Sequence, residues 1–279
     1  FTRARINKSG AEMLLGKIYL YMGKFDQALV QFNNAVNDLP QGNSLTPMAL
    51  YDYNTTLAPA GPWSYNPATS PNTYLFGYPQ NLVNTENLLV RQFTNNWSHF
   101  SNDLLLNTST YALYGANDTR KRLYSTKAYS GSSTLQPGVY RKIAPQFANL
   151  GLNLPDLYLM RAECKARTGD IGGAKDDLEM LTTKRMPVLE ASVPSGLTQE
   201  QMIRFVLDER LREFAMLGYR WFDMRRLSVD PLFSSNTYSH QYLKSDGSVG
   251  ATFVLRPERL TLRFPAKLLA QNPGMPNNP

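Results

Sequence analysis

The spacing of apolar residues predicts two helices within residues 1–40. The first can be capped by Asn7 or Ser9 and is broken at Gly23. Its apolar residues fall on one face at helical spacing: Ala11, Leu14, Leu15, Ile18 and Tyr19. The second runs from about Phe25 to Asp38, and its apolar stripe consists of Ala28, Leu29, Phe32, Ala35 and Val36. We therefore expect a pair of helices joined by a tight turn.

The order of residues in this pair matches one tetratricopeptide (TPR) unit. The matching positions are Leu15, Gly16, Tyr19, Gly23, Ala28, Phe32, Ala35 and Pro40. Residues 154–187 form a second, weaker match, with Ala162, Gly169, Ala174 and Leu178 at the same offsets and Pro187 one position late. The two units are far apart along the chain. Either a large insertion interrupts the repeats, or the units pair only in space.

The residues between these pairs have a different character. Residues 51–100 contain ten aromatic and three charged residues, interleaved with Pro, Gly, Asn and Thr. Long segments without regular structure are uncommon in compact domains unless they are functional. A third helical block, residues 198–217, opens with the capping box of Thr198 and Gln201.

These patterns predict a mainly α-helical, TPR-like fold with a large irregular insertion. We expect four segments within one domain: a TPR-like helix pair at 1–40, an irregular aromatic-rich insertion at 41–150, a TPR-like pair and a further helical block at 151–228, and an irregular C-terminal segment at 229–279.

Composition and charge exclude several classes of protein. The net charge is +7, but the basic residues of 204–226 alternate with Asp208, Glu209, Glu213 and Asp223. Mixed signs are typical of a solvated or ion-paired helix face, so nucleic-acid binding is not expected. One cysteine and two histidines argue against a disulfide scaffold and a zinc site.

The sequence contains no recognisable catalytic motif. GxSxG, HExxH, P-loop and GxGxxG patterns are absent. Acidic pairs such as Asp176–Asp177 are adjacent on a helix and cannot converge on one substrate. We expect a protein that is not an enzyme and uses no cofactor or metal. A glycoside hydrolase remains an alternative that turnover of an oligosaccharide would reveal.

The aromatic residues of the insertion are the best candidates for ligand contacts. Flat aromatic faces can stack on sugar rings or extended peptides, and neighbouring Asn and Gln can bond hydroxyl groups. The candidate residues are Trp63, Tyr65, Tyr74, Tyr78 and Trp97. The alternative for each ring is that it packs the insertion onto the helices.

Residues 207–226, LDERLREFAMLGYRWFDMRR, carry a resemblance to a known family. The block resembles the ERR-E…GxRWFDLxR motif of the SusD/RagB family of outer-membrane nutrient-binding lipoproteins. Three other pieces are similar to family motifs and occur in the same order: Asn117 to Arg122, Leu157 to Asp170, and Phe264 to Gly274. The chain departs from the family at Met216–Leu217, where many members carry an acidic residue.

The resemblance implies a cell-surface protein of the outer membrane that binds a glycan, or in some branches a peptide. Such proteins hand their ligand to a SusC-like TonB-dependent β-barrel transporter and are held by a lipid anchor, which this chain does not contain. The chain looks like the C-terminal portion of such a protein. The resemblance also implies that Trp221 and Phe222 lie in the core as scaffold. The alternative from a different class is a TPR-type scaffold that binds a protein segment or peptide.

Overall fold

The computed structural model describes residues 3–40, 47–63, 77–92, 105–129, 133–145 and 147–278. The protein is mostly helical, as the sequence predicts. It consists of two compact units, Phe1–Leu217 and Gly218–Pro279, which are considered separately below.

The first predicted helix pair is α1 (Lys8–Tyr21) and α2 (Phe25–Asn37). The Asn7 side chain caps α1 by accepting a hydrogen bond from the Gly10 amide, whereas Ser9 is buried and donates to the Ala35 carbonyl. At Gly16 a Cβ atom would lie 2.6 Å from the Phe32 ring, so only glycine allows this close approach of the two helices. The TPR pattern therefore identifies a real packing constraint.

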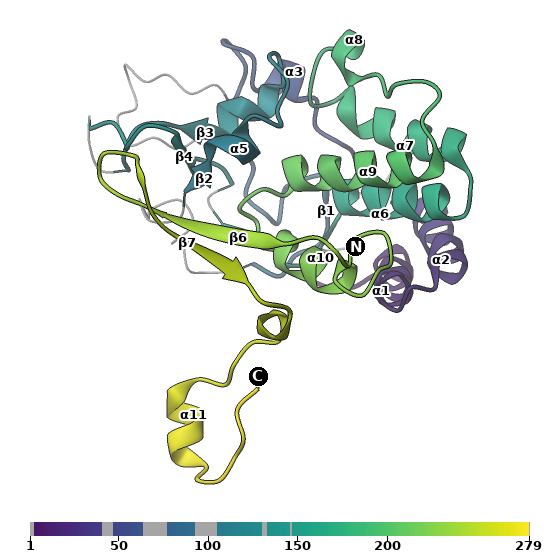
Figure 1. Cartoon of the computed structure of the whole chain (residues 1–279). Coiled ribbons are helices and arrows are strands. Elements are labelled where there is room, and N and C mark those ends of the chain that lie inside the picture. The colour runs from purple at the N-terminus through teal and green to yellow at the C-terminus, as the bar shows by residue number, and fades with distance from the viewer. Residues whose placement is uncertain are drawn as a thin grey trace. The chain divides into compact units, whose positions relative to one another are not determined.

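The second pair is α6 (Leu154–Arg167) and α7 (Ile171–Thr182), and it packs beside the first. Helix α2 contacts α6, and α6 in turn contacts α9 (Gln199–Glu213) (Figure 1). One apolar core joins α1, α2 and α6: Met13, Leu20, Ala28, Phe32, Ala35, Leu154, Leu157, Met160 and Cys164. The two TPR-like units are thus separated in sequence but adjacent in space.

The predicted insertion, 41–150, contains short elements with a core of their own. These elements are α3 (Tyr53–Thr56), β1 (Asn87–Leu89), β2 (Leu106–Asn107), α5 (Thr108–Tyr111), the 3₁₀ helix η1 (Thr119–Leu123), β3 (Tyr124–Ser125) and β4 (Val139–Lys142). Strand β4 pairs antiparallel with both β2 and β3. Strand β1 pairs with β5 (Leu152–Asn153), which leads directly into α6. The pairing of β1 with β5 therefore joins the irregular segment to helix α6.

Helix α9 opens with the predicted capping box, in which Thr198 and Gln201 bond each other's backbone amides. It ends at Glu213, earlier than the predicted Leu217, because the chain turns at Phe214–Leu217. A short helix, α8 (Val188–Ala191), precedes α9.

The second unit begins with α10 (Tyr219–Leu227) and contains a hairpin of β6 (Tyr238–Leu243) and β7 (Val249–Leu255). The unit ends with the 3₁₀ helix η2 (Pro257–Leu260) and α11 (Ala266–Gln271). The expectation that 229–279 is irregular is therefore wrong over the hairpin. Aromatic and β-branched residues on both sides of the Asp246–Gly247 turn are the signal that could have identified it.

One expectation for the second unit needs a further correction. Phe222 is 54% exposed and Trp221 is only partly buried, so neither lies in the core as expected. Asp223, in contrast, is buried and pairs with Arg226 one helical turn later. The RWFD segment therefore presents an aromatic ring outward and keeps its acidic residue inside.

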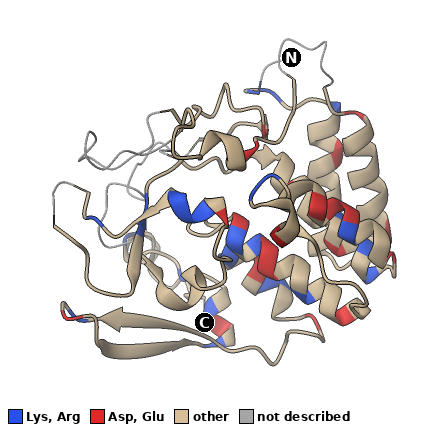
Figure 2. Cartoon of the chain, turned by 90° about the horizontal axis from the view of Figure 1, so that it is seen from above, with Lys and Arg blue, Asp and Glu red and all other residues tan. Residues whose placement is uncertain are grey.

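Charges of both signs are interleaved on the helices and do not separate into a basic and an acidic face (Figure 2). This distribution matches the alternation seen in the sequence. In the ranges that the structure describes, no helix combines the length and the apolar character needed to span a membrane.

Candidate functional site

Trp63 lies at the centre of a cluster of aromatic rings. Its ring centroid is 4.7 Å from that of Tyr51, 5.6 Å from that of Tyr53 and 4.8 Å from that of Tyr78. Only 5% of the residue is exposed. Because its surface is covered by other rings, the burial favours packing over the ligand stacking that the sequence suggested for Trp63.

Tyr78 is partly buried in the same cluster. Its hydroxyl lies 3.4 Å from the hydroxyl of Tyr53, and burial raises the pKa of both phenols above the usual value. Next to it, Gly77 approaches Pro62 so closely that a Cβ atom would lie 1.9 Å from the Pro62 carbonyl oxygen. The contact between Trp63 and Tyr78 therefore holds together the residues that flank positions 64–76 in the sequence.

The other three candidates, Tyr65, Tyr74 and Trp97, lie outside the described residues. The structure brings Trp63 and Tyr78 together. Tyr51 and Tyr53, which the sequence analysis did not single out as candidates, complete the cluster. Both residues lie in the aromatic-rich stretch 51–100, which is the sequence signal that could have identified them as candidates.

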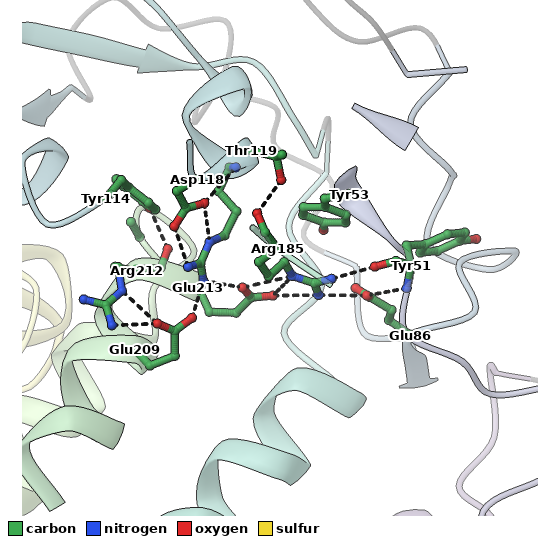
Figure 3. A network of polar contacts seen from close by, with 12 residues as sticks. Tyr51, Tyr53, Glu86, Tyr114, Asp118, Thr119, Arg185, Glu209, Arg212 and Glu213 are labelled. Carbon is green, nitrogen blue, oxygen red and sulfur yellow. Dashed lines mark hydrogen bonds and ion pairs between the residues drawn. The ribbon is translucent and has the colours of Figure 1, made fainter. Parts of the chain in front are cut away.

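Arg185 lies beneath this aromatic cluster and is fully buried (Figure 3). Its guanidinium lies 3.9 Å from the centroid of the Tyr53 ring and donates to the Tyr51 carbonyl at 2.8 Å. It also pairs with Glu86 at 2.8 Å and with Glu213 at 2.9 Å. Arg185 therefore couples the aromatic cluster to the end of α9.

A second buried arginine, Arg120 in η1, extends the network from Glu213 to Asp118 and Glu209. Arg120 pairs with Asp118 at 2.7 Å, with Glu209 at 2.6 Å and with Glu213 at 2.8 Å. Glu209 in turn pairs with Arg212 at 2.7 Å. Two sequence motifs that lie about ninety residues apart, Asp118–Arg120 and Glu209–Glu213, thus meet in the interior.

Helix α6 is joined to α9 and α1 by a similar buried contact. Asp156 accepts from Arg210 at 2.7 Å and from Lys17 at 2.9 Å. Burial raises the pKa of Asp156, but the two cations outweigh this and lower it below the usual value. Glu209, Arg210 and Glu213 of the 207–226 block are therefore interior crosslinks, whereas Asp208 and Arg225 are exposed.

The electrostatics of the main network follow from its pairing. Burial raises the pKa of Glu213, but Arg185 and Arg120 outweigh burial and bring it below the usual glutamate value. At Glu86 burial outweighs Arg185, and the pKa is raised. Each of the two buried arginines pairs with at least two carboxylates, as expected for a charge-paired structural network. The role of this network is to hold the insertion on the helices.

Within the described ranges, His, Cys, Asp and Glu side chains form no group of three that could hold a metal ion. The candidate site among these residues is the cluster of Tyr51, Tyr53, Trp63 and Tyr78, which packs against the buried ion pairs of Arg185.

Comparison with known proteins agrees with this architecture. Residues 152–278 match the model of the SusD family. No curated protein matches the chain. Among solved structures, a protein from Bacteroides vulgatus ATCC 8482 is 24% identical, with a TM-score of 0.63, over 100% of this chain and 60% of that protein.

Two further structures show the same fold. A SusD superfamily protein from Bacteroides thetaiotaomicron VPI-5482 is 17% identical, with a TM-score of 0.63, over 99% of this chain and 61% of its own. A SusD-like carbohydrate-binding protein from Bacteroides vulgatus ATCC 8482 is 16% identical, with a TM-score of 0.55, over 91% of this chain and 51% of its own. The chain thus spans less than two thirds of the length of these relatives.

Proposed function

Because this chain belongs to the SusD/RagB family, we propose that it is part of a non-catalytic, cell-surface protein that binds glycans for import across the outer membrane. Its partner would be a SusC-like TonB-dependent β-barrel transporter, and a lipid anchor would hold the protein at the membrane. The resemblance in fold to a SusD-like carbohydrate-binding protein supports the choice of ligand class.

The observation that carries the proposal is the anchoring of an aromatic cluster on the helical unit. Arg185 contacts Tyr51 and Tyr53 and pairs with Glu213 of α9, and the ring of Trp63 packs against that of Tyr78. A rigid cluster loses little conformational entropy when it takes part in ligand binding. Stacking and hydrogen bonds to sugar hydroxyls would then suffice without a covalent step.

A panel of soluble polysaccharides in native affinity electrophoresis tests the ligand class. We expect retention by at least one glycan, and we expect Trp97→Ala to weaken it about tenfold or more, since aromatic anchors contribute about 2 kcal/mol or more to many interfaces. The Tyr65→Ala and Tyr74→Ala variants extend the test to the other two candidates.

The control for that measurement is Phe222→Ala, which removes an exposed ring outside the insertion. Its glycan retention should equal that of the wild type. Equal retention of all variants, or no retention by any glycan, would contradict the proposed ligand class. Binding to a peptide panel instead would favour the TPR-type scaffold, for which the packing of α2 against α6 supplies the helical surface.

The transporter partner and anchor require the native protein. After detergent extraction of membranes from its own cells, a longer lipidated form that co-purifies with a large β-barrel protein is the expected result. A water-soluble, unlipidated form with soluble partners would contradict the import role and leave the scaffold alternative in its place.

A further inference from the structure

Lys142 carries a buried amine outside the network described above. It lies on β4, is 3% exposed and has no carboxylate within ion-pair distance among the described residues. Its Nζ donates to the Ala215 carbonyl at 2.7 Å and lies 3.4 Å from the Tyr124 hydroxyl. A buried amine without a counter-ion is costly when charged, so its contacts call for a functional explanation.

The carbonyl that Lys142 holds belongs to a strained turn. Residues 214–217 follow α9, and Met216 adopts a φ of 63°, a left-handed conformation that is uncommon for residues with a side chain. Phe214 and Ala215 are buried, and the Leu217 amide donates to the Phe214 carbonyl. Strained backbone persists only where surrounding contacts hold it, and Lys142 supplies one of them.

Groups from several elements surround the amine. The Tyr124 ring on β3 lies 5.1 Å from Nζ, and the Tyr124 hydroxyl bonds the hydroxyl of Tyr114 at 3.0 Å. Tyr114 also donates to the Arg212 carbonyl at 2.6 Å. The nearest charged groups that act on Lys142 are Glu213 on α9 and Arg120 on η1. Both are already paired with each other, so neither is a dedicated partner of the amine.

We propose that Lys142 is a proton-sensitive latch on the turn at residues 214–217, which stays closed over the uncharged amine and opens more often when the amine takes up a proton. The turn forms the end of the first unit, and Gly218 directly follows it in the chain. Opening would release the Ala215 carbonyl, relax Met216 and let the charged amine reach water.

The pH range follows from the burial of the amine. Burial lowers the pKa of Lys142 to about 7, an effect that Glu213 opposes and Arg120 reinforces. In the open turn the amine regains its ordinary value of 10.5. The open form therefore binds more protons between these values, and its population rises as the pH falls from about 10 to 7 and then levels off.

Hydrogen exchange of the amides at residues 214–218 between pH 6 and 9, corrected for intrinsic exchange, tests the latch. We expect the opening constant to rise about tenfold for each unit of pH lost between 9 and 7.5 and to be constant below pH 7. In Lys142→Met, which keeps the length of the side chain but cannot titrate, the opening constant should not depend on pH. Amides of α2 serve as an internal control that should not follow this profile.

A direct titration keeps the proposal testable if Lys142→Met does not fold. The NMR signals of the Lys142 side chain in the wild-type protein should titrate near pH 7. Titration near 10.5, or an opening constant with the same pH profile in wild type and Lys142→Met, would overturn the proposal.

Discussion

Replacement of Glu213 by glutamine is expected to lower the free energy of unfolding by about 3–5 kcal/mol, the usual cost of removing one partner from a buried ion pair. The carboxylate of Glu213 pairs with both Arg120 and Arg185, and all three side chains are buried. Glutamine has nearly the same shape but no charge, so two guanidiniums would remain in the interior with too few carboxylates. Denaturant unfolding at neutral pH measures the effect.

The matched control is Glu200→Gln on the same helix. Glu200 pairs with Arg204 one turn along α9, but the two side chains are 53% and 45% exposed. Exposed pairs of this kind contribute little to stability, so the control variant should unfold close to the wild type. Equal effects of the two substitutions would contradict the assignment of the network as an interior crosslink.

The loss of stability in Glu213→Gln is also expected to depend on pH. The pKa of Glu213 is lower in the folded protein than the usual value of 4.5, because Arg185 and Arg120 outweigh the effect of burial. The folded state thus binds fewer protons at this group, and its stabilising contribution is fully present above pH 4.5 and lost as the pH falls through the lowered pKa. The difference in stability between wild type and Glu213→Gln should therefore shrink below pH 4.5. A difference that stays constant down to pH 2 would contradict this charge-based origin.

Replacement of Trp63 by alanine is expected to destabilise the first unit by about 3–5 kcal/mol, as large-to-small substitutions of buried aromatic residues do. Trp63 contacts the rings of Tyr51, Tyr53 and Tyr78, and alanine would leave a cavity between them. The loss should be visible as a lower midpoint in thermal and denaturant unfolding.

Leu189→Ala provides the comparison for this substitution. Leu189 is 94% exposed in α8 of the same unit, so truncation of its side chain removes few contacts and should change stability little. Near-wild-type stability of Trp63→Ala, together with weaker glycan retention, would assign the ring to ligand binding and contradict its placement in the core.

Local patterns predicted the helical elements well, because those elements depend on residues close in sequence. The α1–α2 pair, the close approach at Gly16 and the capping box at Thr198 all follow from spacing and from short-range backbone bonds. The apolar face expected for α1 is wrong, because Leu14, Leu15 and Ile18 are exposed and the helix buries other residues. The hairpin of β6 and β7 was missed because most of its residues are exposed and its strands do not alternate between apolar and polar residues.

The candidate site was predicted less well, for a different reason. An aromatic residue in an irregular segment has the same local pattern whether it packs or meets a ligand. The sequence left Trp63 with two alternatives, ligand contact or packing onto the helices, and the three rings around it favour packing. Tyr65, Tyr74 and Trp97 remain predictions.

The amino-acid sequence by itself determined the helical class, the paired-helix pattern and, through four ordered motifs, the resemblance to the SusD family, whose model matches residues 152–278. Only the tertiary structure decided that the two helix pairs are neighbours, that Asp118–Arg120 meets Glu209–Glu213, and that Lys142 reaches Ala215. The physical reason is range. Helix formation and capping act over a few residues and leave a pattern in the sequence, whereas burial and ion pairing depend on which distant segments exclude water together.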